Sequence, residues 1–490
     1  MSEKRSGFAR YDNVGEEYLD KRKLKKSAGW ILLWALGVGA VISGDYSGWN
    51  LGLKGGGFGG MALATLLMAA MYVCMVFTIA ELSAALPHAG GFFSFTRNAF
   101  GPIGGFICGL TDTIEYVITP AVIVYFIAGY MENLIPGVAS YVWWILFYAV
   151  FVAINIRGVE LTLKVGLVVT TVALAVLAVF YVSAVATGAF DWELLFNDTP
   201  SGSTGAARWL SQGGHGVFVA LPFAIWFYLA IEQLPLAAEE AHDAVTDMPK
   251  ALIWGIVTLL VLSLLTLVLN TGVGGGVVAI GSSAAPLADG FQAVFGIGAA
   301  SKILILVSLT GLIASFHTII YAYARVLFAL SRSGYFPRWI SLTGRWHTPY
   351  VALILGAVVG LLCTVSIQVA GGEDSAVGAA LLNMAVFGAV ISYTMVMLSY
   401  IKLRITRPDM PRPYVSPLGV PGAVVGTVLS LVALASTFAV EAYRPAVWGV
   451  VLFVAAGMVY FFLFSRHRLV AQAPEEEDAL IAEAEQELAH

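Results

Sequence analysis

The stretch GVGAVISGDYSGWNLGL, residues 37–53, lies in the first long apolar run of the chain and carries a carboxylate, Asp45, near its middle. A carboxylate at the centre of a membrane-spanning helix costs about 2.5–3.5 kcal/mol on insertion scales, so it is rarely kept without a partner. The glycines on both sides of Asp45 lower the cost of leaving helical geometry. The stretch therefore predicts an interrupted membrane-spanning helix that carries a functional carboxylate.

The composition of the whole chain extends this prediction. Of the 490 residues, 59% are hydrophobic and 12% charged, and the mean hydropathy is +0.84, which excludes a soluble globular protein. Runs of about 20 apolar residues can cross a membrane, and such runs begin near residues 29, 61, 102, 138, 162, 214, 251, 300, 349, 376, 419 and 445. We expect an all-α polytopic membrane protein with about 12 transmembrane helices, called spans one to twelve.

Charge predicts how the chain is arranged in the membrane. We divide it into an N-terminal segment (1–28), a transmembrane domain (29–465) and an acidic C-terminal tail (466–490). Of the 26 Lys and Arg residues, 21 fall on the side of the N-terminus, four on the other side, and Arg325 within a span. By the positive-inside rule, both termini face the cytoplasm and the protein lies in the cell membrane. The tail APEEEDALIAEAEQELAH is expected to be a solvated appendage.

Several function classes are not expected from the motifs. The sequence has no Cys or His pairs at metal-ligand spacing and no glycine-rich loop before Lys-Ser/Thr, so we expect neither a metal site nor ATP-driven transport. It has no combination of nucleophile, base and orienting group, so we expect no enzyme and no cofactor. The basic N-terminal cluster borders a span and indicates topology, so no nucleic-acid partner is expected.

A second interruption is predicted in span six, at PFAIWFYLAIEQLPLAAEE, residues 222–240. Pro222 and Pro235 each remove a backbone donor from this span. Matching interruptions in two halves of a sequence mark the binding site of many secondary transporters. Spans one and six would then each open a five-helix repeat, followed by two extra helices.

Span one also carries small residues at four-residue intervals, which close packing against another helix can explain equally well; they are Ala40, Gly44, Gly48 and Gly52.

Three segments resemble the amino acid–polyamine–organocation superfamily of permeases. They are ALGVGAVISGDYSGWNLGL (35–53), PFAIWFYLAIEQLPLAAEEAHDAVTDMPKAL (222–252) and SFHTIIYAYARVLFALSRSGYFPRWISLTGRWHTPYVAL (315–353). The resemblance implies a leucine-transporter-like fold of five-plus-five inverted repeats with discontinuous helices 1 and 6. It also implies alternating access and transport of amino acids or amines coupled to a proton or sodium ion. The segment SGDYSGWNLGL is most similar to the ethanolamine permeases.

Span one departs from the superfamily in a way that predicts the substrate. Relatives that carry amino acids have a Gly-Ser-Gly-type motif whose amides hold the substrate carboxylate; here the matching residues are Ser43, Gly44 and Asp45. A carboxylate at this place repels another carboxylate and attracts an ammonium group. We therefore expect Asp45 to bind a small primary amine, ethanolamine. Two alternatives stay open: Asp45 serves a coupling cation or proton in an amino acid permease, or it forms a structural salt bridge.

The resemblance and the residue types together give a candidate site. The expected substrate-binding residues are Ser43, Gly44, Asp45, Tyr46, Glu115, Trp226, Tyr228 and Leu229. The aromatic faces of Trp226 and Tyr228 can hold a cation. The candidates for ion coupling or gating are Asp112, Glu232, Ser315 and His317. Asp112 and Glu115 share one helix face, and one of them could carry a coupling proton. His317 could titrate near neutral pH or be a hydrogen-bonded structural histidine.

Overall fold

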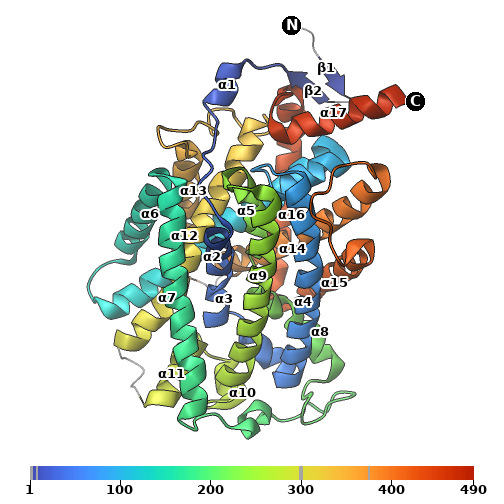
Figure 1. The fold of residues 1–490 in the computed structure, drawn as a ribbon. Coiled ribbons are helices and arrows are strands. Elements are labelled where there is room, and N and C mark those ends of the chain that lie inside the picture. The colour runs from blue at the N-terminus through green and yellow to red at the C-terminus, as the bar shows by residue number, and fades with distance from the viewer. Residues whose placement is uncertain (1–3, 7–8, 297–301, 373–375, 490) are drawn as a thin grey trace.

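The computed structural model describes residues 4–6, 9–296, 302–372 and 376–489 of a chain that is almost entirely helical (Figure 1). In these residues, ten helices are long and apolar enough to cross a membrane. Two shorter apolar helices, Trp30–Tyr46 and Ser140–Ile156, lie at the places predicted for spans one and four. The prediction of an all-α polytopic membrane protein is confirmed.

The helices follow one another along the transmembrane domain, and the longest connection, between α7 and α8, contains the short helix η1. Their bounds are α2 (Trp30–Val41), α3 (Ser43–Tyr46), α4 (Leu51–Ala85), α5 (Phe92–Leu134), α6 (Ser140–Ile156), α7 (Val159–Ala186), η1 (Trp192–Phe196), α8 (Gly213–Ala224), η2 (Ile225–Phe227), η3 (Ile231–Glu240), α9 (Ala244–Leu265), the π-helical turn η4 (Thr266–Asn270), α10 (Gly276–Ile280), α11 (Pro286–Phe295), α12 (Lys302–Arg332), α13 (Tyr350–Val369), α14 (Ala376–Thr406), α15 (Gly419–Ala439), η5 (Glu441–Tyr443), α16 (Arg444–Leu463) and η6 (Ser465–His467).

Span two begins ten residues earlier than its apolar run suggests. The helix α4 starts at Leu51, because it includes the glycine-rich segment 52–60 and passes through Gly57 in a left-handed conformation (φ 64°). Glycine adopts this conformation without the steric penalty of a side chain. Because glycine has a low hydropathy, a search for apolar runs does not detect the first turns of this helix.

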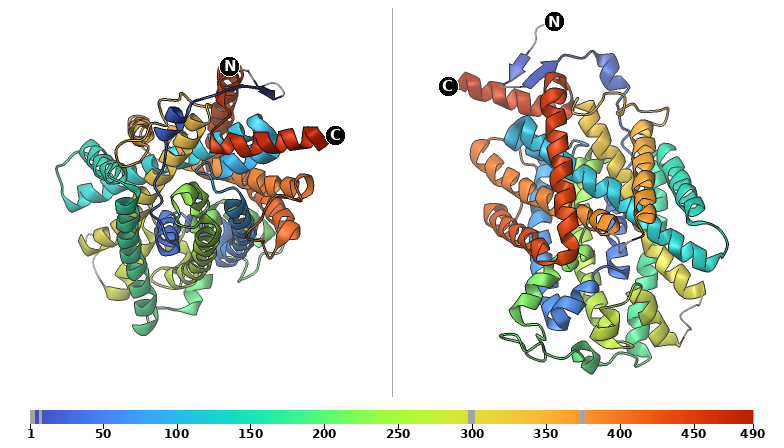
Figure 2. Two further views of the ribbon diagram at one scale, coloured as in Figure 1. Left: turned by 45° about the horizontal axis from the view of Figure 1, so that its top comes forward. Right: turned by 180° about the vertical axis from the view of Figure 1, so that it is seen from behind.

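The interrupted helices lie inside the bundle (Figures 1 and 2). The helix α2 packs against α7, α9 and α12, and α5 packs against α12 and α14. The part of span six that forms η3 also packs against α2 and α12, so spans one, six and eight contact one another.

The two ends of the chain meet at one end of the bundle (Figures 1 and 2). The strands β1 (Lys4–Ser6) and β2 (Ala9–Asp12) pair antiparallel, and β3 (Leu469–Val470) pairs parallel with β2. The helix α1 (Glu16–Asp20) follows the small sheet, and the C-terminal helix α17 (Pro474–Ala489) lies across this end of the bundle. We call it the terminal end.

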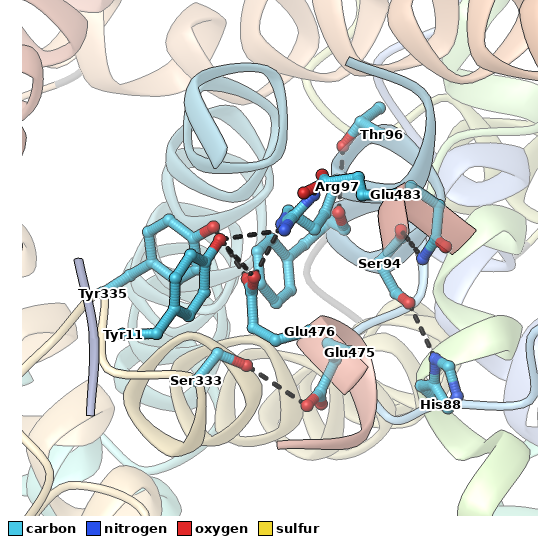
Figure 3. Close-up of polar contacts among 12 residues, drawn as sticks. Tyr11, His88, Ser94, Thr96, Arg97, Ser333, Tyr335, Glu475, Glu476 and Glu483 are labelled. Atoms are coloured by element: carbon cyan, nitrogen blue, oxygen red, sulfur yellow. Dashed lines mark hydrogen bonds and ion pairs between the residues drawn. The ribbon is translucent and has the colours of Figure 1, made fainter. Parts of the chain in front are cut away.

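The prediction that the acidic tail is a solvated appendage is wrong for its first helical turn (Figure 3). Glu475 and Glu476 are both 0% exposed. Arg97 Nε donates a hydrogen bond to Glu476 Oε2 at 2.6 Å, and Arg332 Nη2 lies 2.6 Å from Glu475 Oε1. The acidic composition suggested solvation, but it could not reveal that cationic partners far away in the sequence meet these carboxylates.

Candidate functional site

Span one is interrupted where α2 gives way to α3. The Ser43 N–H donates to Ser315 Oγ at 3.1 Å, and the Ser315 hydroxyl donates to the Gly39 carbonyl at 3.1 Å. An unbroken helix would join the Ser43 N–H directly to the Gly39 carbonyl. The hydroxyl from α12 therefore bridges the break. Span one then ends at Ser47, which has an extended backbone (φ −165°, ψ 164°).

Span six is interrupted between η2 and η3. Ala230 has a left-handed backbone (φ 83°), a conformation that costs a residue with a side chain about 1–2 kcal/mol. Glu232 compensates for this, because its Oε1 accepts the Ala230 N–H at 2.9 Å and the Tyr393 hydroxyl at 2.5 Å. Glu232 thus holds the break in place.

The two breaks touch each other at Gly44. A Cβ atom placed on Gly44 would overlap the carbonyl oxygen of Trp226. Gly48, which has φ 95°, lies against the indole ring of Trp226. The glycine pattern therefore allows both a close helix crossing and an interrupted helix.

A cavity of about 30 Å³ lies beside this crossing. It is lined by Ala40, Val41, Ser43, Gly44, Glu115, Tyr116, Thr119, Val122, Ile123, Trp226, Leu229, Ala230, Ile319 and Ala385. Among these residues Glu115 is the only one with a charged side chain. It is 1% exposed and lies beside the buried carboxyl group of Glu232, with which it can share a hydrogen bond when one of the two carries a proton. Its ionisable neighbours are Glu232 and Asp112.

The cavity brings together five of the eight expected substrate-binding residues, and the other three face elsewhere. The five are Ser43, Gly44, Glu115, Trp226 and Leu229. Asp45 Oδ1 accepts a hydrogen bond from Thr266 at 3.0 Å. The Tyr46 hydroxyl donates to the Ala173 carbonyl at 2.9 Å, and the Tyr228 hydroxyl pairs with Ser263 at 2.8 Å.

Asp45 lies in a dry polar environment beside η4. It is 0% exposed, and its Oδ2 has no hydrogen-bond partner among the residues that the structure describes. A buried carboxylate is stable only when it carries a proton or has a cation beside it. Asp45 can therefore accept a proton or a small cation at this position.

None of the coupling candidates lines the cavity. Asp112 is buried on α5 beside Ser392. His317 is fully buried, and its Nε2 lies 2.8 Å from the Thr162 carbonyl on α7. This contact fits the structural role considered for His317. The Ser315 hydroxyl is bound to the backbone of span one, between the Ser43 N–H and the Gly39 carbonyl.

Several residues of the cavity wall could not be selected from the sequence. Ile123, Ile319 and Ala385 line the cavity from α5, α12 and α14. Apolar residues are expected everywhere in a membrane span, so their type carries no signal of a binding site. Only the position of each residue around its helix brings it to the cavity.

Comparison with known proteins agrees with this architecture. Residues 29–464 match the family model described as amino acid permease. An uncharacterized transporter of Rhizobium meliloti is 28% identical over 70% of this chain and 73% of its own length. The branched-chain amino acid permease of Bacillus subtilis is 23% identical over 91% of this chain and 94% of its own. The lysine-specific permease of Lactococcus lactis is 25% identical over 63% of this chain and 62% of its own length. The chain is a transporter, not an enzyme, and belongs to the amino acid permease family.

Proposed function

We propose that this protein is a secondary transporter that imports a small primary amine, ethanolamine, by alternating access coupled to an ion. The observation that carries the proposal is the cavity at the crossing of spans one and six, where Glu115 provides the only charge. Glu115 and Glu232 are two buried carboxyl groups side by side, and they favour a ligand that brings an ammonium group, because a cation offsets both their burial and their mutual repulsion. The indole of Trp226 lines the same cavity and can add a cation–π contact.

The backbone at the span-one break supports a substrate without a carboxylate. Amino acid carriers of this superfamily use amides at this break to hold the substrate carboxylate. Here the Ser43 N–H is bound to Ser315 Oγ, and the Asp45 N–H is bound to the Ile42 carbonyl at 3.1 Å. These two donors are therefore occupied within the protein.

We assign separate roles to the two buried carboxylates. Glu115 lines the cavity and is the first contact of the substrate ammonium. Asp45 faces Thr266, outside the cavity, and we assign it to the coupling ion, a proton or sodium. For Asp45, this assignment selects the ion-binding role, which was one of the alternatives left open by the sequence.

An amino acid permease is the second candidate function. Relatives from Bacillus subtilis and Lactococcus lactis are named for branched-chain amino acids and lysine. The position of Asp45 outside the cavity also removes one reason to reject a substrate carboxylate. A binding experiment can separate the two candidates.

A thermal-shift screen of the purified protein is expected to rank ligands by charge. Ethanolamine should raise the melting temperature, because a ligand at 100 times its Kd stabilises the folded state by about 2.7 kcal/mol. Alanine and glutamate, which add a carboxylate, should give little shift, and choline should fit the small cavity poorly. Stabilisation by alanine but not by ethanolamine would favour the amino acid permease.

Labelling of tags is expected to place both termini in the cytoplasm. A tag at either terminus should be reached only after cells are permeabilised, whereas a tag inserted between residues 199 and 204 should be labelled in intact cells. The reason is the excess of Lys and Arg on the side of the termini. Labelling of either terminus in intact cells would reverse the proposed orientation.

A further inference from the structure

The first turn of α17 buries two charged side chains at the terminal end. Glu475 and Glu476 are 0% exposed, whereas the next residue, Glu477, is exposed. Burial of two adjacent carboxylates is unfavourable unless each one is paired and hydrogen-bonded. The partners of these two side chains therefore define a specific seat for the tail.

Glu476 occupies the centre of this seat (Figure 3). Its carboxylate accepts hydrogen bonds from Arg97 Nε at 2.6 Å, the Tyr11 hydroxyl at 3.1 Å and the Tyr335 hydroxyl at 2.8 Å. Burial, together with the Glu476 charge, raises the pKa of Tyr11, so this hydroxyl remains a donor at neutral pH. The seat thus joins β2, the start of α5 and the loop that follows α12.

Glu475 connects the tail to the helices that enclose the cavity. Its Oε1 lies 2.6 Å from Arg332 Nη2 at the end of α12. Arg332 Nη1 also donates to Glu239 Oε2 at 2.9 Å, near the end of η3. Arg332 therefore ties α12 to η3 while the tail covers it. The helix α12 lines the cavity through Ile319, and η3 directly follows Leu229 and Ala230, which also line it.

Further contacts keep the tail in one position. Asp478 lies 3.2 Å from His88 in the loop before α5, and this hydrogen bond lowers the pKa of Asp478. The Val470 N–H donates to the Ser333 carbonyl at 3.0 Å, and β3 pairs with β2. The tail is thus held by backbone pairing and by charge.

We propose that the acidic C-terminal helix is a tethered ligand whose binding to this seat keeps the cavity closed at the terminal end. Opening at this end requires α12 and η3 to move apart, and the docked tail covers the arginine that joins them. Release of the tail is then a step of the transport cycle, and a partner that captures the acidic helix would open the transporter. This inference depends on alternating access and is independent of the identity of the substrate.

The test measures access to the cavity from each side of the membrane. A cysteine replaces Ile319 on the cavity wall, in a chain whose native cysteines are changed to serine; these are Cys74, Cys108 and Cys363. A membrane-impermeant thiol reagent then labels the protein in proteoliposomes. Glu476→Gln removes a charged acceptor from the seat, and Glu477→Gln is the matched control on the same turn.

We expect Glu476→Gln to speed labelling from the terminal side by about tenfold or more, because loss of one hydrogen bond to a charged group shifts an equilibrium by that factor. Labelling from the opposite side should not rise. The Glu477→Gln variant should label like the parent. Equal labelling of all three from the terminal side, or equal acceleration of the Glu476→Gln variant from both sides, would overturn the proposal.

A second design avoids any effect of the substitution on folding. A protease site between residues 471 and 473 allows the tail to be cut after the intact protein has folded. Cutting should accelerate labelling from the terminal side, and adding a synthetic peptide of residues 474–490 should slow it again. Labelling that is unchanged by cutting would contradict the role of the tail.

Discussion

Glu115→Gln is expected to weaken ethanolamine binding by about 10- to 150-fold, the range given by loss of a hydrogen bond to a charged group worth about 1.5–3 kcal/mol. The substitution keeps the size of the side chain and removes the charge that faces the cavity. Isothermal titration calorimetry on the purified variant measures the effect. The variant should insert normally, because neutralising a charge within the membrane lowers the cost of insertion.

Asp45→Asn is the matched comparison, because it neutralises a carboxylate that is equally buried but lies outside the cavity. It should leave ethanolamine binding nearly unchanged and abolish accumulation against a gradient in proteoliposomes. If Asp45→Asn weakened binding and Glu115→Gln did not, the two carboxylates would have exchanged roles. In that case the first interpretation of the sequence, a substrate contact at Asp45, would hold.

Gly44→Ala is expected to abolish transport. The added methyl group would overlap the Trp226 carbonyl, and this backbone atom cannot move aside as a flexible side chain can. Overpacking of a well-packed interior typically costs about 1–3 kcal/mol, and here the strain falls on the contact between the two interrupted helices. Uptake and melting temperature of the purified variant together measure the effect.

Gly129→Ala is the control for this substitution. A Cβ atom on Gly129 would meet no other atom within 4 Å, and Gly129 lies within α5. Alanine is a better helix former than glycine, so Gly129→Ala should keep both transport and stability. Normal transport by Gly44→Ala would show that spans one and six need no close approach at this point.

The apolar runs and the interruptions of spans one and six could be predicted from the sequence because both depend on local composition. Length and hydropathy locate a span, and glycine and proline weaken a helix wherever they occur. The glycines near Asp45 and the prolines of residues 222–240 indicated the two breaks in this way. Ala230 was not indicated in this way, because it is an alanine in a left-handed conformation that favours glycine.

The direction of each side chain could not be predicted in the same way. Successive residues of a helix point about 100° apart, so Gly44 can touch Trp226 while Asp45 faces Thr266. Which of the two faces the cavity depends on how the helices rotate when they pack. The sequence therefore identified both carboxylates, Asp45 and Glu115, but not which one lines the cavity.

The burial of the tail in its seat could not be predicted for a related reason. Glu476 and Arg97 are separated by 379 positions in the chain. Their pairing arises only when the two ends of the chain and the start of α5 meet in the folded protein. Local composition describes an acidic segment correctly and says nothing about a partner at this distance.

Uptake of labelled ethanolamine into proteoliposomes, with unlabelled ethanolamine or serine as competitor, tests the central claim most directly. Serine is ethanolamine with a carboxylate attached, so the pair isolates the effect of that group. We predict that excess ethanolamine suppresses uptake and that serine at the same concentration suppresses it far less, because the cavity offers a carboxylate of its own. Equal competition by the two compounds, or no uptake of ethanolamine above protein-free liposomes, would contradict the assignment as an amine transporter.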